Sequence, residues 1–246
     1  VGSSGSEFTV PIAAGESSGT GNLLLPIVLH ELRTTYDFTP VTLAPGQVLT
    51  SPDESVDYVY FIDEGLVTML AGTSAGHTVE VSTVGREGIV GAVGCLGPNF
   101  SPWESRVQVA GNARRVSSRQ LCEDLGSADT PLGGIVLRYL HYEFCQVTQS
   151  GTCGRLHDSS ARVAKWLLIA TERLESAMLP LTHDAIAQVV GGPRHEVSRD
   201  LARLEASGAL QRGRACIWVR DAAALRAAAC ECYDRVRGAR DRLLGP

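Results

Sequence analysis

The side chains best suited to chemistry lie in residues 181–208, LTHDAIAQVVGGPRHEVSRDLARLEASG. Three apolar residues follow the i, i+4, i+7 spacing of a helix that packs on a core: Val197, Leu201 and Leu204. At about 100° per residue, the face turned away from this stripe holds small, polar and cationic side chains: His195, Ser198, Arg199 and Ala202. Such a face fits the major groove of DNA, where these side chains reach base edges. A helical hairpin with a solvated outer face is the alternative interpretation.

A first helix and a tight turn are predicted just before this polar helix. Thr182 can cap the first helix, and Asp184 adds negative charge in its first turn. One side of this helix is apolar, with Ala185, Ile186, Val189 and Val190. Gly191, Gly192 and Pro193 then interrupt it, and proline is well suited to open the next helix.

The stretch LTHDAIAQVVGGPRHEVSRDLARLE resembles, without a gap, the helix-turn-helix of the CRP/FNR transcription regulators. It shares a Thr that opens the first helix, an Ile-Ala pair, Gly at the turn, Arg-x-x-Val-Ser-Arg and Leu-x-x-Leu-Glu. The resemblance implies a bacterial, cytoplasmic homodimer that binds a palindromic operator in double-stranded DNA. It leaves RNA polymerase open as a further partner.

The resemblance also indicates which side chains contact DNA. Arg199 matches the base-reading Arg of the family, and its guanidinium fits guanine O6 and N7. Arg194 reads a base or a phosphate. His195 stands where many relatives have Glu, and Glu196 comes one residue later, so the preferred sequence is expected to differ from the better-known family operators. The other predicted contacts are Ser198 in the second helix, Thr182 and His183 at the start of the first, and Arg212 and Arg214 in a following hairpin.

Charge is distributed unevenly along the 246 residues, although the net charge is −5. Residues 1–158 contain 8 Arg and 17 Asp+Glu, a balance of −9, whereas residues 159–246 contain 14 Lys+Arg and 10 Asp+Glu, a balance of +4. The basic excess therefore lies in the half with the predicted helix-turn-helix, as phosphate binding requires.

The first half alternates short β-branched segments with Gly-containing turns. Strands are predicted at residues 41–43, 56–62, 66–70, 78–84, 107–109 and 113–116, which favours an antiparallel barrel or sandwich. The pieces L-x-P-G-Q, Y-V-Y-F-I-D-E-G and G-R-E-G-I-V-G-A resemble the cyclic-nucleotide-binding jelly roll of the same family. A short helical segment is predicted within residues 10–35, before the strands.

The ligand-binding motifs of that jelly roll are altered in this sequence. Relatives that bind cyclic AMP use Gly-Glu for the ribose and Arg-Ser for the phosphate; here the aligned pairs are Gly91-Ala92 and Glu104-Ser105. Ala92 has no acceptor for a ribose hydroxyl, and Glu104 would repel a phosphate. Arg106 could replace the missing cation if the register slips by one or two residues. We therefore expect no cyclic AMP binding in the usual way, and an unidentified small-molecule effector stays open.

Helices are predicted before and after residue 158, where the acidic and the basic parts of the chain meet. Residues 131–156 read as one long helix that Asp129 or Thr130 caps, with an apolar stripe at 3–4-residue spacing: Leu132, Val136, Tyr139 or Leu140, Phe144 and Val147. The stripe indicates that the helix either forms a parallel dimer axis or packs on the barrel alone. The dimer axis is the role that this helix has in the family. Further helices are expected at 158–175 and, as a single helix, at 221–244, with a wing hairpin at 209–219 between the helix-turn-helix and the last of them.

The seven cysteines are an odd number without a secretory signal, which argues against a disulfide framework and for a cytosolic protein. The chain before Cys95 has no cysteine, which excludes an FNR-type iron–sulfur cluster. We assign no metal ligands and no certain cofactor. Cys230-x-Cys232, with His141, His157 or Cys153 near in space, is left as a metal or thiol-redox alternative. Cys145 and Cys153 are more simply core residues.

Motifs of hydrolases, zinc proteases and P-loop enzymes are absent from the sequence, so we predict no enzyme. The predicted fold class is α+β: an N-terminal antiparallel β jelly roll, a long dimerisation helix and a C-terminal winged helix-turn-helix domain. The expected boundaries are a cloning linker at 1–9, a sensor domain at 10–128, the dimerisation helix at 129–157 and the DNA-binding domain with a helical extension at 158–246. The alternatives are a nucleotide or cyclic-dinucleotide receptor that acts through protein contacts, and a cysteine-based redox or metal sensor.

Overall fold

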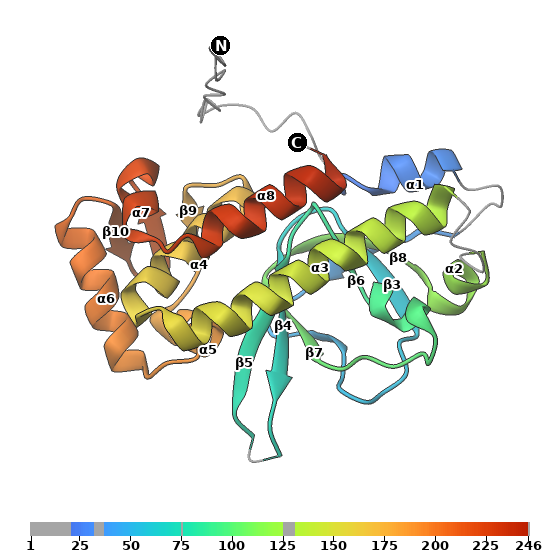
Figure 1. The fold of residues 1–246 in the computed structure, drawn as a ribbon, viewed down its shortest axis with the longest axis horizontal. Helices are drawn as coiled ribbons and strands as arrows, with labels where there is room; N and C mark the ends of the chain where they lie inside the picture. The colour runs from blue at the N-terminus through green and yellow to red at the C-terminus, as the bar shows by residue number, and fades with distance from the viewer. Residues whose placement is uncertain (1–20, 32–36, 75, 125–130, 246) are drawn as a thin grey trace, which may run out of the picture.

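A computed structural model describes residues 21–31, 37–74, 76–124 and 131–245. The predicted linker at 1–9 and the predicted caps Asp129 and Thr130 lie outside the described residues. The described chain has an antiparallel β domain, a long helix across its face and a C-terminal helical domain with a small sheet (Figure 1). This confirms the predicted fold class. No helix among the described residues is long and apolar enough to cross a membrane.

The β domain consists of two four-stranded antiparallel sheets, with strand orders β1-β8-β3-β6 and β2-β7-β4-β5. The strands are β1 (Thr39–Leu43), β2 (Val48–Thr50), β3 (Tyr58–Ile62), β4 (Leu66–Gly72), β5 (Thr78–Val84), β6 (Ile89–Val90), β7 (Glu104–Val109) and β8 (Gly111–Ser117). Buried apolar side chains from both sheets, among them Leu43, Ile62 and Met69, form the core between them. Every predicted strand is present, and β2 and β6 are additional.

Short helices close the ends of this domain. They are α1 (Leu25–Glu31), a 3-10 helix η1 (Ala92–Leu96) and α2 (Ser118–Asp124). Cys95 in η1 and Cys122 in α2 form a disulfide, with 5.0 Å between their Cα atoms. The sequence argument against disulfides was wrong for this pair, because spacing along the chain does not reveal that the two helices meet.

The long helix α3 (Pro131–Leu156) has the predicted bounds and two different sides. Ile135, Val136 and Tyr139 are buried in one core with α1, β3 and α8. On another side Leu137 and Phe144 are 43% and 68% exposed. Packing on the protein is thus confirmed for one side of the helix, and the dimer axis stays a prediction for the side that is open.

The C-terminal domain contains five helices and a three-stranded sheet among the described residues. The helices are α4 (Ser159–Leu174), α5 (His183–Val190), α6 (Arg194–Ala206), α7 (Ala222–Ala228) and α8 (Cys232–Leu244). The strands β9 (Met178–Leu179), β10 (Leu210–Gly213) and β11 (Cys216–Val219) pair in the order β10-β11-β9. The β10–β11 hairpin is the predicted wing.

The last helical segment differs from the prediction of one helix at 221–244. The backbone at Ala229 is extended, with φ −80° and ψ 155°, so α7 ends there and α8 begins at Cys232. An Ala- and Arg-rich sequence gives no local signal for this break. The break lets α8 turn back and run alongside α3 (Figure 1).

Candidate functional site

The helix-turn-helix is formed by α5 and α6, and its local structure follows from its capping residues. The Thr182 side chain accepts a hydrogen bond from the Ala185 backbone N–H at 3.1 Å and begins α5. Gly191 ends α5 in the left-handed region, with φ +66°, which an L side chain rarely adopts. Pro193 then precedes α6. These features are the ones expected from the sequence.

The inner face of α6 is as predicted, because Val197, Leu201 and Leu204 are buried in the core of the C-terminal domain. The outer face is less uniform. Arg194, His195 and Arg199 are exposed, whereas Ser198 and Ala202 are half-buried. The sequence therefore identified the core side of the helix correctly, and three of its polar side chains are available to a partner.

Two predicted DNA contacts bond to each other within the protein. The His183 Nδ1 atom lies 3.0 Å from the Ser198 hydroxyl oxygen, a hydrogen bond between the start of α5 and the middle of α6. Burial, followed by the charges of Arg212 and Arg194, lowers the pKa of His183 below its usual value. A neutral imidazole therefore predominates at pH 7, and this pair can orient the two helices as well as contact DNA.

Arginines around this face are held by carboxylates. Arg194 Nε lies 2.8 Å from Asp184 Oδ1, and both side chains are about two-thirds exposed. In the wing, Arg212 donates from its backbone N–H to Glu205 at 2.8 Å and from Nε at 2.7 Å. These bonds from Arg212 lower the pKa of Glu205. Because exposed ion pairs contribute about 0–1 kcal/mol, Arg194 can exchange its carboxylate partner at small cost.

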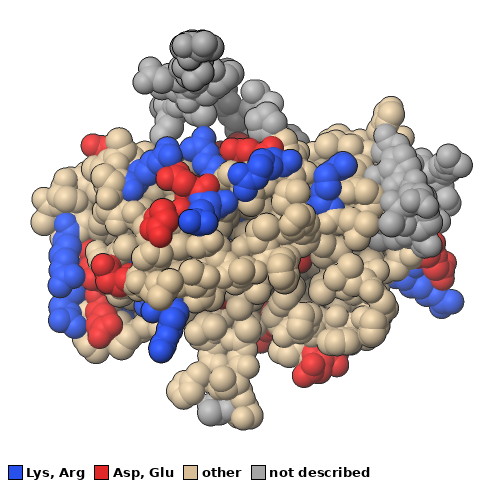
Figure 2. Space-filling model, in the orientation of Figure 1, with Lys and Arg blue, Asp and Glu red and all other residues tan. Residues whose placement is uncertain are grey.

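Basic atoms gather at the end of the molecule that carries this helix. Lys and Arg atoms form a strip along the left edge in Figure 2, over α6, with Asp and Glu atoms beside it. Arg214, in the turn of the wing, is exposed as well. Because positive and negative side chains lie beside one another at this edge, the surface is cationic only in places.

The expected ligand residues of the β domain divide between two places. Gly91 has φ +90° and precedes η1, and a Cβ there would come within 2.8 Å of the Tyr58 carbonyl oxygen. Ala92 is buried. In β7 the residues alternate, so that Ser105 is buried and its Oγ accepts a hydrogen bond from Thr50 Oγ1 at 2.8 Å.

Arg106, the alternative cation for a phosphate if the register slips, has a partner of its own. Arg106 Nη2 lies 2.6 Å from Glu104 Oε1, and the two side chains are partly exposed on the same face of β7. Glu104 thus neutralises the arginine two residues away. This geometry is consistent with the expectation that a cyclic phosphate is not held here as in cyclic-AMP-binding relatives.

Sequence reasoning missed a buried ion pair where the three parts of the molecule meet. Arg173 in α4 pairs with Glu87 at 2.9 Å, with both side chains almost fully buried. The same guanidinium donates to Tyr142 Oη at 2.9 Å and Gln146 Oε1 at 2.6 Å in α3, and to the Thr83 carbonyl in β5. Burial raises the pKa of Tyr142 to about 12.

A cavity of about 540 Å³ lies at the same junction, where β5, α3, α4 and α5 meet. Glu80 and Lys165 line it, together with Val79 and Gly191. Burial raises the pKa of Glu80 above its usual value, and Lys165 opposes that rise. Cys153 lines the cavity as well.

The structure brings together three of the free cysteines and one histidine. The ligand atoms of Cys153, His157, Cys230 and Cys232 all lie within 4.8 Å of one another. His141, which the sequence offered as another neighbour, is not in this group. The signals in the sequence were Cys230-x-Cys232 and the four-residue spacing of Cys153 and His157, but these two pairs lie more than 70 residues apart along the chain.

Comparisons with known proteins agree with this division of the chain. Residues 40–122 match the cyclic nucleotide-binding domain, and residues 161–228 match the Crp-like helix-turn-helix domain. A search of curated proteins finds no match.

Solved structures share the fold at low sequence identity. FixK2 from Bradyrhizobium japonicum is 20% identical, covers 78% of this chain and 98% of its own, and has a TM-score of 0.68. A CRP-family transcriptional regulator from Thermus thermophilus is 20% identical, with coverage of 78% and 99% and a TM-score of 0.63. The c-di-GMP-responsive global regulator CLP from Xanthomonas campestris is 16% identical, with coverage of 74% and 94% and a TM-score of 0.59.

Proposed function

Since the chain belongs to the CRP/FNR family of transcription regulators, we propose that it binds a palindromic operator as a homodimer and does not respond to cyclic AMP in the usual way. The observation that carries the proposal is the exposed outer face of α6, with Arg194, His195 and Arg199, on a helix whose other face is buried in the domain core. A two-fold dimer would present two such helices to half-sites about 34–36 Å apart.

Self-association through α3 is supported by the open side of that helix. Leu137, Leu140, Phe144, Val147 and Gly151 recur at alternating spacings of three and four residues. Leu137 and Phe144 are exposed in the single chain, and a Cβ at Gly151 would meet no atom within 4 Å. This is the a/d pattern of a two-stranded coiled coil, whose partner would cover the two large apolar side chains.

The DNA-binding proposal is tested with genomic fragments that the purified full-length protein captures. Sequencing them should yield an inverted repeat, and fluorescence anisotropy on that repeat should lose affinity steeply as salt rises from about 50 to 200 mM, because Arg–phosphate contacts release counterions. Captured fragments without a common motif, or affinity that is independent of salt, would contradict it.

The proposed lack of cyclic AMP binding rests on Ala92 and on the Glu104–Arg106 pair. A ribose hydroxyl finds no carboxylate at Ala92. Arg106, the arginine of β7, already has its Nη2 atom 2.6 Å from Glu104 Oε1. Calorimetric titration of the protein with cyclic AMP should give no heat of binding at micromolar ligand. Binding at micromolar concentration would overturn this part of the proposal.

A further inference from the structure

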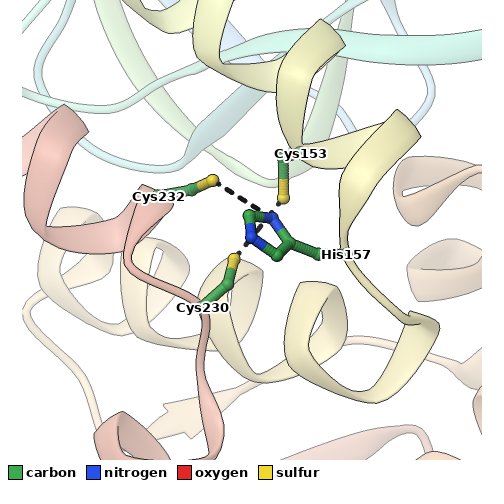
Figure 3. Close-up of side chains that lie close together, drawn as sticks. All are labelled: Cys153, His157, Cys230 and Cys232. Atoms are coloured by element: carbon green, nitrogen blue, oxygen red, sulfur yellow. Dashed lines mark hydrogen bonds between the residues drawn. The ribbon is translucent and has the colours of Figure 1, made fainter.

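The cluster of Cys153, His157, Cys230 and Cys232 joins two parts of the molecule that are far apart in the sequence. Cys153 lies near the end of α3, and His157 follows that helix by one residue. Cys230 lies in the break between α7 and α8, and Cys232 begins α8. The four side chains point toward one another between these segments (Figure 3). All three cysteines are buried, and His157 is half-buried.

The distances within the cluster are those of ligands around a single tetrahedral ion. Zinc–sulfur bonds of about 2.3 Å and zinc–nitrogen bonds of about 2.0–2.1 Å put neighbouring ligand atoms about 3.6–3.8 Å apart. Here Cys153 Sγ and Cys230 Sγ are 3.5 Å apart, and Cys232 Sγ and His157 Nδ1 are 3.4 Å apart. Since no pair of ligand atoms exceeds 4.8 Å, small side-chain shifts are enough to enclose an ion.

Two neighbouring side chains orient the ligands. The Glu231 carboxylate lies 3.3 Å from His157 Nε2, so Nε2–H can donate a hydrogen bond to it, and Nδ1 is then the unprotonated nitrogen that faces the cysteines. The Gln149 amide donates to Cys232 Sγ at 3.0 Å. A carboxylate behind a ligating histidine and an N–H group on a ligating sulfur are the usual supports of zinc sites.

We propose that Cys153, His157 through Nδ1, Cys230 and Cys232 bind one zinc ion in a closed, tetrahedral site. Three thiols lose their protons to solvent, three Zn–S bonds and one Zn–N bond form, and no electron is transferred. Three thiolates and Zn²⁺ give the site a net charge of −1. Lys165 and Arg162 line the cavity that Cys153 also lines, so positive charge lies near the site.

The zinc ion acts as a clamp between α3 and the C-terminal end of the DNA-binding domain. Without it, α8 is held on α3 by Val236, Ala239 and the rest of their shared core. With it, the break at 229–231 is tied directly to the end of α3. The four ligands leave no open position, so the site is structural and does not serve catalysis.

The test begins with the full-length protein, stripped of metal by a chelator under reducing conditions. Zinc titration in competition with a chromophoric chelator should show one ion bound per chain. Cobalt should give the thiolate charge-transfer band and the intense visible bands of a tetrahedral site. Five cysteines are free, and zinc should protect three of them from a thiol reagent.

Variants separate the cluster from the other cysteines. Cys232→Ser and His157→Gln should abolish stoichiometric binding, and Glu231→Gln should weaken zinc affinity roughly 10–100-fold because it removes the support of His157. Cys145→Ser and Cys216→Ser are the matched controls, since both cysteines are free and half-buried outside the cluster, and they should bind zinc as the parent does.

Several results would overturn the proposal. They are less than half an ion per chain, a cobalt spectrum of an octahedral site, zinc binding that survives Cys232→Ser, or a Cys153–Cys230 disulfide that forms equally fast with and without zinc. The measurements need no DNA, so they stand apart from the proposed operator binding.

Discussion

Arg199 is the residue whose proposed role in DNA recognition is easiest to test, since it is exposed on α6 and its helix is anchored on the opposite face. Arg199→Ala should weaken binding to the captured operator by about 1–3 kcal/mol and relax the preference at one base position, because a bidentate guanine contact is lost. Anisotropy titrations against operators with single base changes measure both effects.

The matched control for Arg199 is Arg119→Ala in α2, which removes the same charge from a side chain that is 86% exposed in the β domain. It should leave operator affinity and base preference unchanged. Equal losses for the two variants would mean that net charge, and not a base contact, explains the effect.

Arg173 stabilises the fold, because its guanidinium is buried and bonds to three other segments. Arg173→Met should lower the free energy of unfolding by about 3–5 kcal/mol, since it leaves Glu87 buried without its cation. Chemical denaturation gives the difference. Arg226→Ala removes the exposed 2.6 Å pair with Asp234 and should cost at most about 1 kcal/mol.

A double variant distinguishes a lost ion pair from lost packing at Arg173. Adding Glu87→Gln to Arg173→Met should recover part of the stability, because the uncompensated carboxylate is gone. Additive losses from the two substitutions would show that the contribution of Arg173 to stability does not depend on the Glu87 carboxylate.

At the scale of elements, α3 carries the prediction about assembly. Phe144→Glu puts a charge in the middle of the proposed coiled-coil seam and should convert the dimer to a monomer, because burying that carboxylate has no compensating partner. Sedimentation velocity measures the change.

The control for the seam lies on the same helix. Leu156 is as exposed as Phe144, at 71% against 68%. Because it lies twelve residues after Phe144, its side chain points about 120° away from the seam. Leu156→Glu should therefore stay dimeric. A parent chain that sediments as a monomer would refute the α3 dimer itself.

The elements also show what the sequence could determine. The bounds of α3 and β5, the position of α4 and the turn at Gly191 were predictable, because apolar periodicity and turn residues act locally. The break at Ala229 was not, since alanine favours helix and the break is set by the packing of α8 on α3.

In the candidate sites, too, local features were predictable from the sequence and long-range contacts were not. The outer face of α6 could be derived from helical angles alone. The cysteine cluster and the Cys95–Cys122 disulfide depend on contacts across 77 and 27 residues, which no spacing rule encodes. The hydrogen bond between His183 and Ser198 was missed for a similar reason, because it joins two helices through their crossing geometry.

For the whole molecule, several contacts among the described residues tie the DNA-binding domain to the rest, and three of them come from different elements. Arg173 bonds to the β domain and α3, α8 packs along α3, and Val79 of the β4–β5 hairpin lies against Gly191 at the turn of the helix-turn-helix. A change in the β domain or in α3 can therefore reach the position of α6 through several connections. We expect any effector to work by shifting this arrangement between two states.

Buried acid in α3 makes the stability of the whole molecule depend on pH. Burial raises the pKa of Glu143 from about 4.5 to about 8, and one of its carboxylate oxygens has no hydrogen-bond partner among the described residues. Between these two pH values the folded chain holds a proton that the unfolded chain has lost. The contribution of Glu143 is therefore neutral below pH 4.5 and increasingly unfavourable up to about pH 8, on the order of several kcal/mol in total.

Glu143→Gln keeps the shape of the side chain and removes this titration. We expect the variant to match the parent near pH 4.5 and to be more stable than it at pH 8, with the difference growing steadily in between. Urea denaturation at a series of pH values gives the two curves, and Glu123→Gln, at an exposed position of α2, is the control that should follow the parent. If the Glu143→Gln and parent curves run parallel from pH 4.5 to 8, the carboxyl group titrates normally in the folded protein, and α3 tolerates its charge.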